Sequence, residues 1–148
     1  MSWVQDRHGN EKLIAEQSPE LWTSLCAALK EDVAVFNGLY LHEGRPVEYK
    51  NSKELATIRW PTSIGRDASH PESQRYVEAN VSFEIAQRSP VVTCSYSHSP
   101  SSGEGRMFAF GLDDNGKVAF KRDGYSLGVE EVSRDILERM LFEDVLKR

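Results

Sequence analysis

The chain has 148 residues, a formal net charge of −5 at pH 7 and only two cysteines. This length is near the commonest size of one domain, so we expect a single domain over residues 1–148 with one core. The acidic charge disfavours a dedicated nucleic-acid binder, which needs clustered cations. No apolar run has the length of a signal peptide core or a membrane span, which predicts a cytoplasmic protein without membrane contact.

The first 17 residues give mixed signals, because their apolar start fits a strand or a docked arm while residues 8–10 indicate a turn. A helix start is predicted at Ser18 and Pro19, where a hydroxyl caps free amides and proline takes the first helical position. Apolar residues then recur at steps of three and four, as in an amphipathic helix that ends near Asn37. They are Leu21, Trp22, Leu25, Cys26, Leu29, Val33 and Phe36.

The next segment carries weaker patterns. Residues 39–41 and 47–49 fit short strands, and residues 55–60 fit either a strand or a helical turn cut off by Pro61. Residues 61–74 hold two prolines, one glycine and three serines with few apolar residues, which predicts a long loop. Loops of that length in a compact domain are usually functional or mobile.

Residues 77–85 have the strongest strand pattern in the chain. Apolar and polar residues alternate strictly, which indicates a strand with one buried face. A two-residue turn at residues 88–89 would lead into a second strand and set Phe83 opposite Cys94. Matching of the two apolar faces supports this register more than turn chemistry does.

A second hairpin is indicated by an Asp-Asp-Asn-Gly sequence between residues 106–112 and 117–122. A two-residue turn would set apolar residues opposite small or charged ones. A three-residue loop with Gly116 at positive φ pairs Phe110 with Phe120 instead. We therefore predict the three-residue loop.

A turn at Asp123 and Gly124 precedes the last predicted helix, which starts at Ser126 or just after it. One side of this helix is apolar and the other is charged, so we expect the helix to pack against the core through a single apolar stripe. The stripe consists of Val129, Val132, Ile136, Leu137, Met140 and Leu141, with Phe142 outside it.

Together these patterns predict an α+β fold. It contains an N-terminal helix, an antiparallel β-meander sheet of four to six strands and a C-terminal helix. Each helix has one apolar stripe and the meander has one apolar face, so both helices are expected on that face.

No set of residues predicts catalysis, a metal site or a bound cofactor. His8, His42, His70 and His98 lack further ligands at metal spacing. Cys94 and His98 share a strand face, but residues four apart on a strand lie roughly 13 Å from each other, too far for a thiolate–imidazole pair. Cys26 and Cys94 sit in apolar patterns typical of buried thiols, and nothing indicates a disulfide between them.

Three further segments contain the residue types of a binding site without its arrangement. Residues 97–106 are rich in hydroxyls and glycine but join two strands, whereas phosphate loops lead into a helix. Three arginines near Trp60 fit a phosphate or single-strand contact, but acids alternate with them, which indicates a self-paired loop. Residues 113–115 lack the downstream ligands of a calcium loop and fit a turn.

The second face of the meander is the predicted working surface. Solvent faces of antiparallel sheets usually carry long polar side chains, whereas this face carries small ones that let a partner approach the backbone. Its residues are Asn80, Ser82, Thr93, Ser95, Ser97, Ala109, Gly111 and Ala119, edged by Glu78, Glu84, Met107 and Lys121. We call this set of eight the small-residue face.

These observations favour a non-enzymatic protein-interaction module, either a homodimer or a binder of one protein partner. Two alternatives stay open. The order of elements resembles a helix-grip protein, in which a curved sheet wraps a helix around a small molecule or lipid. The acidic charge also fits a chaperone or immunity-type protein that binds a client.

Overall fold

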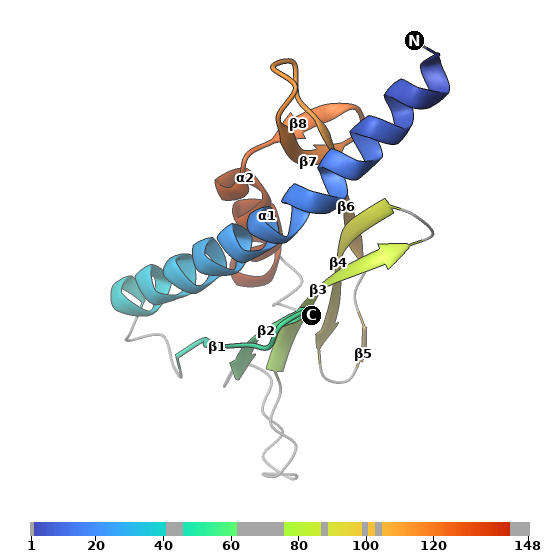
Figure 1. Cartoon of the computed structure of the whole chain (residues 1–148). Coiled ribbons are helices and arrows are strands. Elements are labelled where there is room, and N and C mark those ends of the chain that lie inside the picture. Colours follow the sequence, from blue (N-terminus) through green and yellow to red (C-terminus); the bar gives the residue numbers. More distant parts are fainter. Residues whose placement is uncertain are drawn as a thin grey trace, which may run out of the picture.

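The computed structural model describes residues 2–40, 46–61, 76–86, 89–98, 101–102 and 105–142. Within them lie two helices and one antiparallel sheet (Figure 1). The elements in chain order are α1 (Trp3–Leu39), β1 (Glu48–Asn51), β2 (Leu55–Pro61), β3 (Tyr76–Ala86), β4 (Ser89–His98), β5 (Ser101–Ser102), β6 (Arg106–Leu112), β7 (Val118–Arg122), β8 (Tyr125–Leu127) and α2 (Val129–Leu141).

The sheet is a meander of seven strands in the order β1-β2-β3-β4-β6-β7-β8, with the short β5 paired to β4. The α+β prediction is confirmed, although the sheet has more than the four to six strands expected. The additional strand is β8, at one edge of the sheet, where residues 125–127 were expected to start the last helix. At the other edge, residues 48–51 form β1, which confirms the short strand predicted at residues 47–49.

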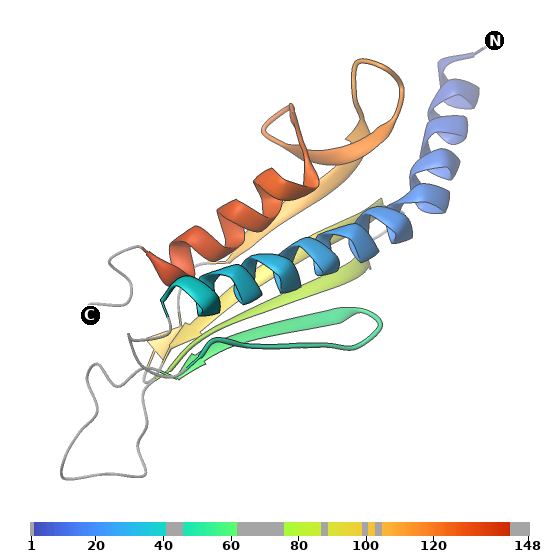
Figure 2. The same cartoon turned by 90° about the vertical axis from the view of Figure 1, so that its left-hand side faces the viewer.

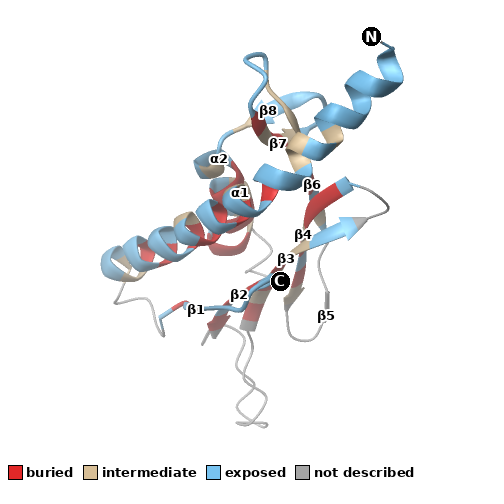
Figure 3. Ribbon diagram, viewed as in Figure 1, coloured by how far each residue is buried: buried red, intermediate tan, exposed pale blue. Residues whose placement is uncertain are grey.

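Both helices pack on the same face of the sheet, as predicted (Figure 2). The buried stripes of α1 and α2 meet the inward side chains of the strands, and burial is concentrated between the two layers (Figure 3). The fully buried side chains that fill this space include Phe108, Phe120, Leu25, Leu29, Ile58, Ile136 and Met140. The core therefore lies on one side of the sheet only.

The first helix begins 16 residues earlier than we predicted, at Trp3 instead of Pro19. Ser2 and Gln5 form a capping box, in which the Gln5 amide donates to Ser2 Oγ (3.2 Å) and Gln5 Oε1 accepts from the Ser2 amide (3.0 Å). The turn predicted at residues 8–10 is wrong, because they are helical. Ser18 and Pro19 have the residue types of a helix start but lie inside α1.

Pro19 lies inside α1, and the helix changes direction between its N-terminal part and the part that lies over the sheet (Figure 2). Proline lacks the amide proton of an internal helix bond and its ring crowds the preceding turn, so it kinks helices. Residues 2–10 beyond the bend are all exposed. The bend thus separates a projecting arm from the part of α1 that covers the sheet.

The pairing of β3 with β4 keeps the predicted faces but not the predicted register. Phe83 pairs with Val92 and Val81 with Cys94, so the strands are shifted by two residues and Ala86 pairs with Ser89. A two-residue shift leaves each side chain on the same face, so face matching cannot detect it.

The second hairpin has the predicted three-residue loop. Leu112 pairs with Val118 and Phe110 with Phe120. Gly116 has φ +76°, the left-handed conformation that glycine adopts without strain. Asp113 Oδ1 accepts from the amides of Asn115 (2.8 Å) and Lys117 (2.9 Å), which closes the loop.

The turn at Asp123 and Gly124 is also confirmed, but it has another consequence than expected. Both residues have positive φ (52° and 84°), as in the type I′ turns that join hairpin strands. The chain therefore returns as β8, and α2 begins only after Gly128, whose amide donates to Glu131 Oε1 (3.1 Å).

Of the weaker predictions, residues 55–60 are a strand and not a helical turn, since β2 pairs with both β1 and β3. The strand predicted at residues 39–41 is wrong for Leu39, which ends α1, and for Tyr40, its C-cap. Leu41, nearly all of the predicted loop at residues 61–74, and a continuation of α2 beyond Phe142 lie outside the described residues.

Candidate functional site

The register places the small-residue face on the open side of the sheet, away from both helices. Ser82 pairs with Thr93 and Asn80 with Ser95 on β3 and β4, and Gly111 pairs with Ala119 on β6 and β7. Directly paired residues share a face, so the eight predicted residues form one continuous surface. Whether this surface binds anything stays a prediction.

Polar groups on this face bond to one another. Ser82 Oγ and Thr93 Oγ1 lie 2.7 Å apart, and Thr57 Oγ1 donates to Asn80 Oδ1 (3.3 Å). The Lys121 side chain lies across Gly111, since its Cγ is only 2.8 Å from where a Cβ on that glycine would sit. The polar side chains of the face are therefore partly paired with one another.

Three larger apolar side chains also lie on the open face. Two of them were not predicted there, and Met107 was predicted only at the edge. Met107 and Leu55 are 62% and 41% exposed. Val91, which pairs with Ala109, points to this side and is nevertheless buried. Residues 91, 93, 95 and 97 alternate with core positions along β4, and this alternation assigns Val91 to the open face.

Cys94 is a core residue and lies among the buried side chains on the covered side of β4. Burial is the largest effect on its thiol and raises the pKa to about 11, despite the nearby Tyr96 hydroxyl and Arg106, which lower it. A thiol that stays protonated is a poor nucleophile. Both cysteines are free and buried, and the His98 side chain lies outside the described part.

Of the three segments that contain the residue types of a binding site, only residues 113–115 lie wholly among the described residues. Trp60 is buried in the core and contacts Phe36, so it offers no stacking platform to a nucleic acid. Arg66, Arg75 and residues 99, 100, 103 and 104 lie outside the described residues. Residues 113–115 form the hairpin turn, where the amides of Lys117 and Asn115 lower the pKa of Asp113.

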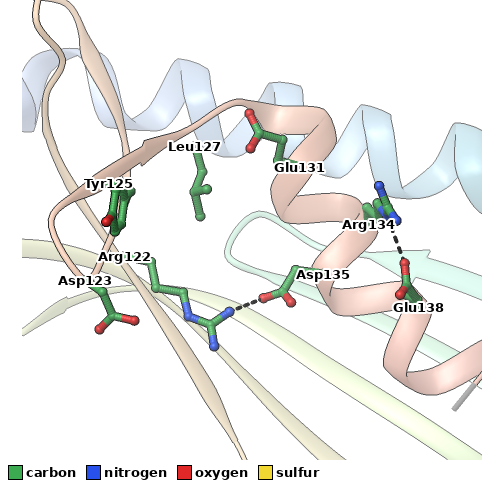
Figure 4. Close-up of a pocket in the computed structure, with 8 residues that line it drawn as sticks. All are labelled: Arg122, Asp123, Tyr125, Leu127, Glu131, Arg134, Asp135 and Glu138. Carbon is green, nitrogen blue, oxygen red and sulfur yellow. Dashed lines mark hydrogen bonds and ion pairs between the residues drawn. The ribbon is translucent and has the colours of Figure 1, made fainter.

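A charged hollow of about 450 Å³ lies between the β7–β8 hairpin and α2 (Figure 4). Arg122 reaches across it to Asp135 of α2, with Nη1 2.5 Å from Oδ2. Arg134 pairs with Glu138 (2.8 Å) along the helix. The hollow is lined by Arg122, Asp123, Tyr125, Leu127, Glu131, Arg134, Asp135 and Glu138.

Asp135 also binds Arg106 of β6, whose Nη1 lies 3.2 Å from each carboxylate oxygen. The Nε of Arg106 is buried and finds no acceptor among the described residues. One carboxylate thus ties α2 to two strands, and four of the six charged residues that line the hollow form ion pairs with one another.

The second hollow is an apolar groove of about 650 Å³ on the outer surface, between α1 and α2. We call it the interhelix groove. Its exposed apolar side chains are Val35 (49%), Leu39 (68%) and Phe142 (58%). Its lining consists of Ala28, Glu31, Asp32, Val35, Phe36, Leu39, Tyr40, Glu130, Arg134, Leu137, Glu138, Leu141 and Phe142.

Sequence reasoning did not identify the interhelix groove, although a signal was present. Val35 falls outside the buried stripe of α1, and Phe142 falls outside that of α2. Exposed apolar residues mark a contact surface when they gather into one patch, whereas single ones are common on any surface. Only the packing of the helices brings these two residues to one groove.

Within the described residues, no group of three or more His, Cys, Asp or Glu side chains could hold a metal ion. No described helix combines the length and apolar content needed to cross a membrane. Comparison with protein-family models, curated proteins and solved structures found no match.

Proposed function

We propose that this protein is a non-enzymatic interaction module that forms a homodimer through its open sheet face. The observation that supports it is the one-sided coverage of the sheet: α1 and α2 occupy one face, and the small-residue face is left uncovered by any described element. A two-layer domain with a bare sheet face gains by stacking a second sheet there.

The size of the face suits a dimer. The face covers five adjacent strands, β2, β3, β4, β6 and β7, which are 7, 11, 10, 7 and 5 residues long. At usual strand spacings, five strands by about seven residues of strand length span roughly 24 by 23 Å. This is on the order of the ~800 Å² that each partner contributes to a standard interface. Small side chains in the centre permit the approach of about 10 Å typical of stacked sheets.

Charge also favours a second copy as the partner. By register, the open face carries three acids and three bases, which cancel, whereas the whole chain has a net charge of −5. Two copies can therefore meet on this face without the repulsion that other surfaces would produce. The six residues are Glu48, Lys50, Arg59, Glu78, Glu84 and Lys121.

The proposal is tested by placing bulk and charge in the centre of the face. Ser95 and Ala109 are both exposed, so the double change Ser95→Arg with Ala109→Arg leaves the core intact. Light scattering should give the mass of a dimer for the natural protein and of a monomer for the variant, since two arginines from each copy would be forced together.

The matched control is Ser24→Arg with Ala34→Arg, which makes the same two substitutions at exposed positions of α1. This variant should remain dimeric. A natural protein that is monomeric at all concentrations, or an open-face variant that keeps the dimer mass, contradicts the proposal.

The helix-grip alternative requires space between the sheet and the helices for a ligand. In the described residues this space is filled by buried side chains such as Phe108, Phe120 and Met140. The geometry therefore favours the interaction module. Native mass spectrometry would support the alternative if a lipid or small molecule were retained.

A further inference from the structure

The interhelix groove differs from the open sheet face in both shape and charge. Ala28, Asp32, Val35 and Leu39 recur at helical spacing along α1, and Glu130, Arg134, Leu137 and Leu141 do so along α2. Two such stripes side by side form a groove of the kind in which a third helix packs in a helix bundle. The α1 stripe runs over 11 residue steps, about 16 Å, or three helical turns.

The base of the groove is rigid and aromatic at one end. Phe36 stacks on Tyr40 with ring centroids 4.6 Å apart, and Phe142 meets both rings edge-on at 5.6 and 5.7 Å. Farther along, Ser133 of α2 donates to Asp32 of α1 (2.7 Å). These contacts fix the spacing of the two helices, so the groove is preformed for an incoming partner.

The rim of the groove is acidic. Its lining includes four acids, Glu31, Asp32, Glu130 and Glu138, and one base, Arg134, which is already paired with Glu138. Charge complementarity therefore selects a basic partner. A second copy of this acidic chain, or an anionic membrane surface, fits this rim poorly.

The direction of the helices adds to the negative potential. Contacts Asp32–Ser133 and Phe36–Phe142 show that α1 and α2 run in parallel, so their C-terminal ends lie together (Figure 2). Helix C-termini carry partial negative charge. The last turn of α1 has no basic residue, and the one basic residue in the last turn of α2, Arg139, lies over the Tyr96 ring on the sheet side. The segments that follow, residues 41–45 and 143–148, each have formal charges that cancel.

From this combination we infer that the interhelix groove binds an amphipathic helix of another protein, about three turns long, with an apolar face flanked by lysine or arginine. The apolar face would cover Val35, Leu39 and Phe142, while its cations would meet the acidic rim. This surface is separate from the open sheet face, so either can bind without the other.

The test uses the full chain and two synthetic peptides that fold as amphipathic helices. One is made of leucine and lysine, and the other has glutamate in place of every lysine. Fluorescence anisotropy of the labelled peptides should show binding of the lysine peptide, at least about tenfold tighter than that of the glutamate peptide, and weakened by added salt.

Variants then locate the site. Glu31→Lys with Glu130→Lys should weaken binding of the lysine peptide at least about tenfold, whereas Glu16→Lys with Glu20→Lys, the same charge change on exposed residues outside the groove, should weaken it far less. Val35→Ser with Leu39→Ser should also weaken it. Its control, Val4→Ser with Ile85→Ser, removes two aliphatic side chains of similar exposure outside the groove and outside the small-residue face.

Equal weakening by the groove variants and their controls overturns the inference, because binding would then follow net charge alone. Equal affinity for both peptides, or no binding of either, also overturns it. Loss of the dimer mass in the groove variants would assign the groove to a second copy and contradict it. A monomeric natural protein that binds the lysine peptide in the groove contradicts only the homodimer proposal.

Discussion

The two faces of the sheet are built from the same strands, but one packs against the helices and the other is not covered by any described element. On β6, Phe108 is fully buried beneath the helices, whereas its neighbour Met107 is 62% exposed on the open side. The covered face carries the large apolar side chains that stabilise the fold, and the open face carries mainly small or polar ones. Alternation along a strand thus separates residues that hold the protein together from residues free to serve binding.

The sharpest test of this difference substitutes the two neighbours in turn. Phe108→Ala should lower the free energy of unfolding by about 3–5 kcal/mol, because it removes a buried ring and leaves a cavity. Met107→Ala should change it by less than about 0.5 kcal/mol. Urea denaturation at low protein concentration measures both, and similar losses for the two would mean that the open face is packed in the monomer.

A second prediction concerns how α2 is fixed on the covered face. Asp135→Ala should cost about 2–3 kcal/mol, since it leaves the mostly buried Arg106 and the nearby Arg122 without their shared carboxylate. Glu138→Ala is the control, because it removes an exposed ion pair with Arg134 worth about 0.3–0.5 kcal/mol. Thermal or urea unfolding of both variants would show whether the network anchors the helix.

The buried thiol of the covered face gives a pH test. The pKa of Cys94 is raised to about 11 in the folded chain, so its stabilising contribution is complete below the unfolded pKa and is lost as pH rises through the folded value. Between pH of about 8.5 and 11, the natural protein should lose up to about 2 kcal/mol more than Cys94→Ala. A constant difference between the two proteins over this range would place the thiol in solvent.

The smallest effect is expected on the open face. Gly111→Ala puts a methyl group 2.8 Å from Cγ of Lys121, a flexible side chain that can move away. The gain in strand propensity from replacing glycine offsets that shift, so the free energy of unfolding should change by less than about 0.5 kcal/mol. A loss above about 2 kcal/mol would show that Lys121 is held in place and that this face is more rigid than its small residues suggest.

Several predictions from the sequence succeeded because local chemistry alone determined them. The loop before Lys117 needs a residue at positive φ, and Gly116 is the one that adopts it without strain. Strict alternation assigned residues 77–85 to a half-buried strand. The start of α1 was missed because Ser18 and Pro19 resemble a helix start, whereas the capping box at Ser2 and Gln5 was the signal to use.

Other features had no local signal. A shift of two residues between β3 and β4 leaves every side chain on its face, so the sequence pattern is the same for both registers. Asp135 appears as one of many charges on the polar side of α2 until Arg106 and Arg122 are brought beside it. The interhelix groove likewise depends on which stripe of α1 faces α2.

The amino-acid sequence by itself determined the class of fold, the faces of its helices and strands, and the small-residue face, because periodicity and turn chemistry act over a few residues. The tertiary structure alone decided the register of β3 against β4, the return of the chain as β8 and the acidic groove between α1 and α2. These features depend on contacts between residues far apart in the chain. A local sequence pattern does not specify which distant helix or strand an element will pack against.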